Sequence, residues 1–415
     1  MSKKTKEVKN KGPLRLLFGF FSSFKLATVV FVLMTLITLF GTLDQVEHGL
    51  HAAKVKYFHS WIVFDKVWGL PVVLPGGLLL MIVLCVNMLC GAIIKVRKRW
   101  RGAGLLISHS GMLMLLAGGW ITWAIATDGY MALYPGMTSS RVESYRDWQL
   151  EVYPLAEDGS PKTAWILPTE TLQRIQSDQK FAANAEGLPF DIVINGYAEN
   201  ATPIPVSAPI AATATGKEID GFKLSPKKRA KEEAMNLPGC YIEFRPKGDS
   251  GGEPVEAILW AGSYKFDPRN DPMPMRFEIG GEPYAAMLAK KSWNVPFEVT
   301  LDEFIFEKHP GISTARNYES RVTRIEEGKD NKPLEIKMNE PMRYAGFTFF
   351  QESFGPAGSE PGDEMYSQFA VANNPADQWP LWALCVTGVG LLIHFVIMLI
   401  DFILRSRKKR ATATS

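Results

Sequence analysis

Residues 105–126 read LLISHSGMLMLLAGGWITWAIA, and this stretch decides how the chain is organised. It is long and apolar enough to cross a hydrocarbon core of about 30 Å as one helix, which takes roughly 20 residues. Directly after it the pattern changes to short alternating runs, which continue from Asp128 to Gln378. The stretch therefore predicts the last of a group of transmembrane helices before a long polar insertion.

Three further segments have the same apolar character. Two precede the quoted stretch, at residues 26–43 and 72–94, and one follows the insertion, at residues 379–404. Each is close to the length that spans a bilayer. The sequence therefore predicts a membrane protein with four transmembrane α-helices in a 3+1 order. A large extracytoplasmic domain, all-β or mainly-β, is inserted between helices 3 and 4.

The basic residues fix the expected orientation, because cytoplasmic flanks of transmembrane helices carry the excess of Lys and Arg. Basic clusters lie at residues 1–15, 95–101 and 405–410. All three are cytoplasmic only if the insertion is outside. The expected regions are a cytoplasmic basic N-terminus (1–25), a three-helix membrane region with an outer interfacial loop at 44–71 (26–126), the extracytoplasmic domain (127–378), the fourth helix (379–404) and a cytoplasmic basic tail (405–415).

The interfacial loop alternates aromatic residues, among them Tyr57, Trp61 and Trp68, with charged ones, and predicts an amphipathic segment on the outer membrane surface. His48 and His51 lie in the same loop, but no further metal ligands are nearby, so solvated histidines are favoured there. The net charge of +3 reflects basic residues at the membrane borders. We interpret them as topology signals and contacts with membrane lipids, and we expect no nucleic-acid partner.

The insertion predicts strands rather than helices. Ten runs alternate apolar and polar residues between separators rich in Gly, Pro, Asn and Asp, which is typical of an antiparallel sandwich or a curled, barrel-like sheet. One helix is predicted near residues 224–236, where Ser225 and Pro226 form a start signal. The ten runs are WQLEVYPL, FDIVINGYA, CYIEFRP, AILWAG, MRFEIGG, FEVTLDEFIFE, ESRVTRIE, LEIKMN, FTFFQESF and SQFAVAN.

Catalytic motifs are missing from the insertion. The sequence has no G-x-S-x-G, H-E-x-x-H or C-x-x-C motif and no phosphate-binding glycine loop there, and its single histidine, His309, lies in a predicted turn. Cys240 is its single cysteine, so no internal disulfide is expected. Cys85, Cys90 and Cys385 lie in predicted spans, where packing is their favoured role. The first span reads as an uncleaved signal anchor.

Two histidines lie within predicted spans, where ionisable residues are costly and therefore informative. His109 has the small neighbours Ser108, Ser110 and Gly111, which would let a helix or a flat ligand approach closely. His394 is expected somewhat deeper in the membrane, and Asp401 lies near the inner end of its span. Each histidine is either bonded to a neighbouring carbonyl or serine, or serves as an axial ligand to haem iron.

Two longer motifs in the insertion carry a family resemblance. The runs VPFEVTLDEFIFEKHPGISTARNYESRV and NEPMRYAGFTFFQESF resemble the ResB (CcsB) family of cytochrome c biogenesis proteins of System II. The 3+1 layout and the FGTLDQ sequence at the outer end of the first span fit the same family. His309 departs from the family pattern, which more usually has an aromatic residue before the Pro-Gly turn, so it is not assigned a role.

The resemblance implies a subunit of a membrane cytochrome c synthase. Such a subunit, with a CcsA-type partner, binds haem in the membrane as transient cargo, helps deliver it outward and supports its attachment to apocytochrome c. It also implies that His109 is a haem axial ligand, with the other ligand from the partner or, as a weaker candidate, from His394. The thiol nucleophiles belong to apocytochrome c, so no catalytic residue is expected in this chain. The expected location is a bacterial inner membrane.

Two other functions fit the composition. A membrane-anchored extracytoplasmic sensor or scaffold needs no haem, and a four-span anchor with an outer β domain would suit it. An exporter-type permease is disfavoured, because four spans are too few for a transport path in one chain and no cytoplasmic coupling domain is present.

Overall fold

The computed structural model describes residues 12–67, 70–96, 99–175, 179–213, 216–248, 253–263, 269, 273–311 and 315–413. The chain divides into two compact units. Unit 1 comprises Met1–Ala126 and Asn374–Ser415, and unit 2 comprises Thr127–Asn373. Of the predicted basic clusters, residues 1–11 and 97–98 lie outside the described ranges.

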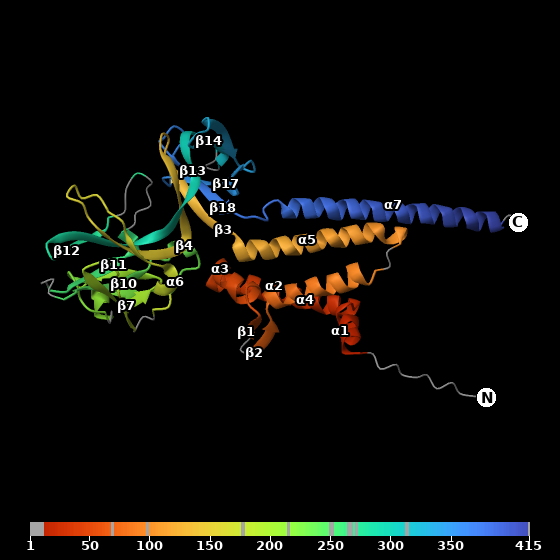
Figure 1. The fold of residues 1–415 in the computed structure, drawn as a ribbon, viewed down its shortest axis with the longest axis horizontal. Helices are drawn as coiled ribbons and strands as arrows, with labels where there is room; N and C mark the ends of the chain where they lie inside the picture. Colours follow the sequence, from red (N-terminus) through yellow and green to blue (C-terminus); the bar gives the residue numbers. More distant parts are fainter. Residues whose placement is uncertain are drawn as a thin grey trace. The chain divides into compact units, whose positions relative to one another are not determined.

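Unit 1 contains four helices that are long and apolar enough to cross a membrane, counted over the described residues (Figure 1). The four predicted spans are therefore helical. They are α2 (Phe24–His48), α4 (Gly77–Met88, continued by the π-helix Leu89–Ile94), α5 (Ala103–Ile125) and α7 (Trp379–Ala413).

The ends of these helices differ from the predicted ones. Residues 72–75 were expected in the second span but belong to strand β2 (Leu70–Pro75), which pairs with β1 (Ile62–Val67). Pro71 and Pro75 lack the N–H that a helix interior requires, so the helix begins only after them. The last helix, α7, continues beyond residue 404 into the predicted basic tail, as far as Ala413.

The predicted interfacial loop holds more structure than an amphipathic surface segment. After α2 come α3 (Leu50–Ala53), a π-helix (Lys54–Phe58) and the β1–β2 hairpin. Tyr57 and Val63 are 1% exposed and pack in a core with α2 and α4, whereas Trp61 is exposed. Trp68 lies outside the described residues. Part of the loop thus folds inward onto the helices.

A short helix, α1 (Pro13–Phe21), lies in the region predicted only as a basic N-terminus. The buried Asn87 of α4 fixes the junction between α1 and α2. Its Nδ2 donates to the backbone oxygens of Phe21 and Ser23, at 2.6 and 3.0 Å. A helix end leaves carbonyls without intrahelical partners, and this side chain satisfies one of them.

The helices α5 and α7 run side by side (Figure 1). Three glycines spaced seven apart on α5 allow this approach: Gly104, Gly111 and Gly118. A Cβ at Gly104 would lie 2.4 Å from the backbone nitrogen of His394, and one at Gly111 would lie 2.8 Å from the backbone oxygen of Ala383. Small residues at such an interface let two helix backbones pack closely.

Unit 2 is built around two long strands, β4 (Thr138–Pro154) and β13 (Glu282–Lys308), which pair antiparallel. Their sheet has the strand order β15-β14-β13-β4-β3-β18-β17-β16, with β12 on β13 and β5 on β4. The other strands of this sheet are β3 (Thr127–Leu133), β5 (Trp165–Leu167), β12 (Met275–Ile279), β14 (Ala315–Ile325), β15 (Lys332–Lys337), β16 (Met342–Tyr344), β17 (Phe347–Gly355) and β18 (Tyr366–Asn373).

A second sheet covers one half of the long strands. It has the order β11-β10-β7-β6, and its Phe244 stacks on Phe277 of β12 with ring centroids 4.1 Å apart. This half is a sandwich. Its strands are β6 (Lys180–Ala183), β7 (Phe190–Ala198), β10 (Gly239–Pro246) and β11 (Val255–Trp260), with a separate hairpin of β8 (Ala201–Pro205) and β9 (Phe222–Pro226).

The other half of the large sheet curls around its own core, in which Phe349 and Phe369 are fully buried. Ser320 of β14 bonds to Gln351 of β17, although these strands are far apart in the sheet order. The sandwich and the curled sheet, which the sequence left as alternatives, thus both occur and share β4 and β13. Each of the ten predicted runs contains a strand, although some extend past its end: the run AILWAG leaves β11 after Trp260 and ends in a 3-10 turn.

The helix predicted near residues 224–236 is wrong. Its first residues finish strand β9, and only a 3-10 turn forms at Glu233–Met235. Tertiary hydrogen bonds override the local start signal. The N–H of Lys227 donates to the backbone oxygen of Asn200 at 2.8 Å, and the N–H of Ala230 donates to the side chain of Asn236 at 2.7 Å.

Candidate functional site

His109 projects from α5 with one ring nitrogen already occupied. Its Nδ1 lies 2.7 Å from the backbone oxygen of Leu105, one turn earlier on the helix. A carbonyl oxygen only accepts hydrogen bonds, so Nδ1 carries a proton, and in a neutral imidazole this leaves the lone pair on Nε2. Histidines that bind metals almost always donate their other N–H in this way. The imidazole is therefore oriented for a ligand at Nε2.

The small neighbours of His109 do not leave the open space that the sequence suggested. Ser108 is buried and donates to the backbone oxygen of Thr387 at 3.2 Å, and a Cβ at Gly111 would lie 2.4 Å from Thr387 Oγ1. Ser110 is exposed and bonds within its own helix. Ser108 and Gly111 thus pack against α7, and only Ser110 is open.

His109 itself lies on a different face of α5. At 3.6 residues per turn, it is about 140° around the helix from Gly104, which contacts α7. It lies almost in line with Leu116, two turns further along, which packs against the core that includes Leu80 and Leu84 of α4. His109 thus shares the α4-facing side of α5.

The structure does not bring His394 together with His109. The backbone nitrogen and Cα of His394 lie 2.4 and 2.7 Å from the Cβ position of Gly104, so His394 is on the side of α7 that packs against α5. Its Nδ1 is buried and has no hydrogen-bond partner among the described residues. The expectation that His394 lies deeper than His109 is wrong. Along α5, Gly104 is about 7.5 Å nearer to the basic end than His109.

Asp401, the acid of the fourth span, is paired. Its Oδ2 lies 3.0 Å from Nε of Arg101 and 3.9 Å from Nη2 of Arg405. Both arginines come from the basic flanks, so the ion pair fastens the ends of α5 and α7 to each other. Its role is structural.

A groove opens between α4 and α5, on the same side of α5 as His109. Its volume is about 580 Å³, and its walls are almost wholly apolar. Pockets of roughly 300–1,000 Å³ are typical for small molecules and cofactors. The lining residues are Phe58, His59, Leu78, Met81, Ile82, Cys85, Val86, Leu116, Ala117, Gly119, Trp120, Ile121 and Trp123.

His59 is the one imidazole in the lining of this groove, and it was not among the predicted site residues. Its ring lies edge-on to Trp123, with centroids 6.1 Å apart. Burial lowers the pKa of His59 below its ordinary value of 6.5, and the nearby charge of Lys54 lowers it further. The neutral form, which can bind a metal, is thus the form present at neutral pH. No sequence motif marks this residue, because its setting depends on how the loop folds.

A cluster of charges holds the loop that carries His59. Lys56 Nζ donates to Asp44 at 2.9 Å and to Asp65 at 3.0 Å, and Tyr57 donates to Asp65. Burial alone would raise the pKa of Asp65, but the bonds from Tyr57 and Lys56 outweigh it and lower that pKa. Burial and the Asp65 carboxylate raise the pKa of Tyr57 to about 12. His48 also contacts Asp44, at 3.2 Å.

In unit 2, the residues of the two long sequence motifs meet at a buried polar triad. Ser320 Oγ donates to Gln351 Oε1 at 2.7 Å and lies 2.8 Å from Ser367 Oγ, and Gln351 Nε2 donates to Ser367 Oγ at 2.9 Å. Buried polar groups cost free energy unless they are paired, and here each is paired. The triad joins strands β14, β17 and β18, so these motif residues support the curled sheet.

Three residues of unit 2 that could carry chemistry are Lys290, Cys240 and His309. Lys290 is 7% exposed and donates to the backbone oxygen of Tyr145 at 2.7 Å; burial lowers its pKa to about 8. Cys240 is fully buried, and burial raises the pKa of its thiol to about 12. His309 is exposed in a turn. Within the described ranges of the whole chain, no three His, Cys, Asp or Glu side chains gather as a metal site.

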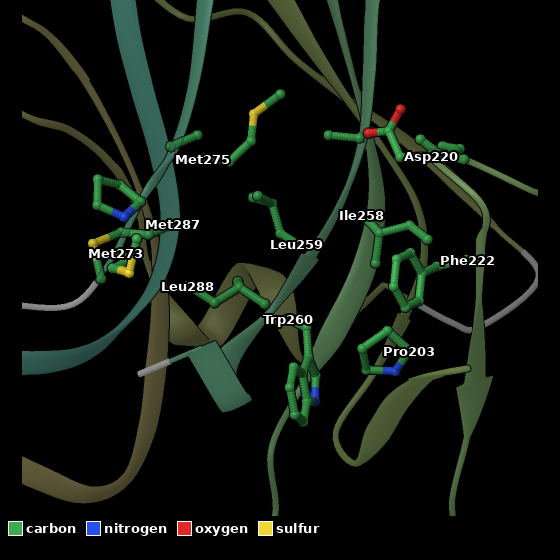
Figure 2. Close-up of a pocket in the computed structure, with 14 residues that line it drawn as sticks. Pro203, Asp220, Phe222, Ile258, Leu259, Trp260, Met273, Met275, Met287 and Leu288 are labelled. Carbon is green, nitrogen blue, oxygen red and sulfur yellow. The ribbon is translucent and has the colours of Figure 1, made fainter. Parts of the chain in front are cut away.

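Figure 2 shows a hollow of about 440 Å³ in unit 2. Ile258 and Trp260 of β11 lie on one side of it, and Met273 and Met287 lie on the other. Asp220 is the one titratable residue in its lining, and it is exposed. The hollow offers apolar contact and supplies no pair of groups for acid–base or nucleophilic chemistry.

Together, these features define a class: a protein with four helices long and apolar enough to cross a membrane, counted over the described residues, a β-rich unit between the third and the fourth of them, and a histidine on one of these helices whose Nδ1 is bonded to a backbone oxygen. The ResB-like family model matches residues 284–363, which include both long motifs. The family resemblance is thus confirmed over this region, and the chain carries a ResB-like domain. No curated protein matches the chain.

Proposed function

We propose that this chain is a subunit of a membrane cytochrome c synthase. It holds haem within the membrane at His109, passes it outward with a CcsA-type partner, and supports its attachment to apocytochrome c. The ResB-like domain at residues 284–363 supports a role in cytochrome c biogenesis. In this arrangement α2, α4, α5 and α7 cross a bacterial inner membrane, unit 2 is extracytoplasmic, and both termini are cytoplasmic.

One observation carries the haem assignment: the Nδ1–H of His109 is anchored on the backbone oxygen of Leu105. This bond fixes the tautomer and leaves Nε2 for iron. Haem iron accepts two axial imidazoles. His394 lies where α7 contacts Gly104, and Gly104 is on a different side of α5 from His109. We therefore assign the second imidazole to the partner subunit.

The chain's own contribution is binding and orientation. The haem is cargo, and the nucleophiles of thioether formation are the cysteine thiols of apocytochrome c. In this proposal the chain is a non-catalytic subunit of the synthase.

The test is to co-express the chain with its CcsA-type partner, purify the complex in detergent and record its visible spectrum. We expect a Soret band with low-spin bis-imidazole features that His109→Ala weakens or shifts and that His394→Ala leaves unchanged. His309→Ala is the matched control, because His309 lies in an exposed turn of unit 2. A colourless wild-type complex would instead favour the membrane-anchored sensor or scaffold.

A further inference from the structure

We infer that the groove between α4 and α5 is a second holding site for haem, with the imidazole of His59 as its iron ligand. This inference rests on the proposed function, because it takes haem as the cargo. It adds a stage: haem held at His109 moves along one face of α5 to the end of the groove where His59 lies.

The shape and chemistry of the groove favour a flat, apolar macrocycle. Phe58, Trp120 and Trp123 supply aromatic walls, and the volume of about 580 Å³ is within the range of cofactor sites. An acyl chain of a lipid would also fit apolar walls, but it has no atom that binds an imidazole nitrogen. A metal-bearing macrocycle uses both features.

His59 is held in place by the backbone around it. A Cβ at Gly76 would lie 2.0 Å from the backbone oxygen of Ser60, and one at Gly77 would lie 2.8 Å from Cα of Phe58. The residues on both sides of His59 therefore rest directly on the start of α4. The N–H of Gly76 also donates to the backbone oxygen of Trp61 at 2.7 Å. A ligand on such a support is positioned by the fold.

The charge at this end also suits haem, which carries two carboxylates. Lys54 is exposed and close enough to His59 to influence its charge. A lysine beside an apolar groove can pair with a propionate while the macrocycle stays in the groove. The imidazole ring of His59 makes no hydrogen bond to the side chains or backbone that the structure describes, so no partner must be displaced.

The two histidines lie along one path. His109 is on the α4-facing side of α5, and Leu116, which lines the groove, is two turns away, about 10.5 Å along the helix. Among the described residues, no ion pair and no close glycine contact lies on this face between His109 and Leu116. The opposite side of α5 differs, because glycine contacts and the ion pair between Arg101 and Asp401 join it to α7. In this proposal haem passes from His109 along this face, past Leu116, to the groove.

The experiment is a titration of the purified complex of the full-length chain and its CcsA-type partner, in detergent, with ferric haem, followed by visible spectroscopy. The wild type should take up two equivalents. His59→Ala and His109→Ala should each lose one equivalent, with different residual spectra, and the double variant should lose both. Added imidazole should restore the lost band in His59→Gly. His309→Ala should titrate as the wild type does.

Gly119→Phe is a second variant, which keeps His59. A Cβ at Gly119 meets nothing within 4 Å, so the ring can fill the groove without disturbing the fold. It should lose the same equivalent as His59→Ala, with an unchanged melting temperature. If both variants titrate as the wild type does, the inference is wrong and the groove is a lipid contact. If the wild type binds a single equivalent that only His109→Ala removes, the proposed function stands without the second site; if it binds none, both fail.

Discussion

The two sides of α5 differ in how closely they pack: one side is in contact with a neighbouring helix, and the other borders a groove. Toward α7, Gly104, Gly111 and Gly118 bring backbones into contact, and Ser108 adds a hydrogen bond across the interface. Toward α4, the helix presents large side chains, among them Trp120 and Trp123, beside a groove.

The difference lies in where the polar groups are placed. On the α7 side the polar atoms of Ser108 and Thr387 are consumed by packing, whereas on the α4 side the Nε2 atom of His109 is left for a ligand. Close packing on one side gives the helix a fixed position, and a ligand site on the other side depends on that rigidity. The α7 side is a packing surface, and the α4 side is the one to which we assign ligand binding.

The largest expected effect comes from Gly111→Leu. A side chain there would collide with the backbone of α7, 2.8 Å from the oxygen of Ala383, which cannot move aside cheaply. Overpacking of this kind costs about 1–3 kcal/mol or more, and we expect the upper end, measured as thermal stability in detergent. Gly119→Leu is the matched control and should have little effect. Equal losses in the two variants would contradict the contrast between the two sides.

Lys56→Met should loosen the loop that carries His59. It leaves Asp44 and Asp65 without their shared cation, and hydrogen bonds to charged groups contribute about 1.5–3 kcal/mol. Because Lys56 is one third exposed, solvent screening favours the low end of this range. Lys54→Met, at an exposed position, is the control for stability. A melting temperature unchanged by Lys56→Met would show that the cluster does not hold the loop.

The same cluster predicts a dependence of stability on pH. The pKa of Asp65 is lower in the folded chain than its ordinary 3.8, so its stabilising contribution is complete above about pH 4 and is lost as the pH falls through the folded pKa. Melting temperatures between pH 3 and pH 7 should therefore fall more steeply at the acid end for the wild type than for Asp65→Asn. If the melting temperatures of the wild type and Asp65→Asn fall equally with pH, Asp65 is not the cause of the pH dependence.

Two adjacent glycines offer a finer test. Gly119→Ala should stabilise α5 by about 1 kcal/mol, because alanine has the higher helix propensity and its Cβ enters open space. Gly118→Ala should gain nothing, because its Cβ would lie 3.0 Å from the Cβ of Trp379. The comparison needs only the difference between the two melting temperatures. If Gly118→Ala is instead the more stable variant, α7 does not contact α5 at Gly118.

The smallest effect is expected from Ser108→Ala. Its hydroxyl donates to Thr387 on the neighbouring helix, and such bonds between membrane helices are worth on the order of 0.6 kcal/mol. Ser110→Ala removes a bond within α5 on an exposed side and should be neutral. A chemical-denaturation series on the two variants measures the difference. If Ser110→Ala lowers the free energy of unfolding more than Ser108→Ala does, the stabilising polar contacts are not on the α7 side.

Much of the fold was predictable because its signals are local. An apolar run of about 20 residues and a strand with alternating polarity follow from the sequence alone. The first half of β13 was missed for a physical reason. Ala285 and Ala286 are both fully buried, since the sheet is covered on both faces there, and alternation disappears. The wrong helix at residues 224–236 failed in a similar way, because distant groups such as Asn200 supplied the hydrogen bonds.

His109 could be singled out from the sequence, because an ionisable residue in an apolar run is conspicuous whatever surrounds it. The face on which it lies, its bond to Leu105, the separation of His394 from it and the role of His59 came only from the tertiary structure. The sequence determined the four apolar helices, the β-rich insertion and the ResB-like motifs, because hydropathy and alternation act over neighbouring residues. The glycine contacts, the groove and the placement of the histidines join residues far apart in the chain, so only packing could decide them.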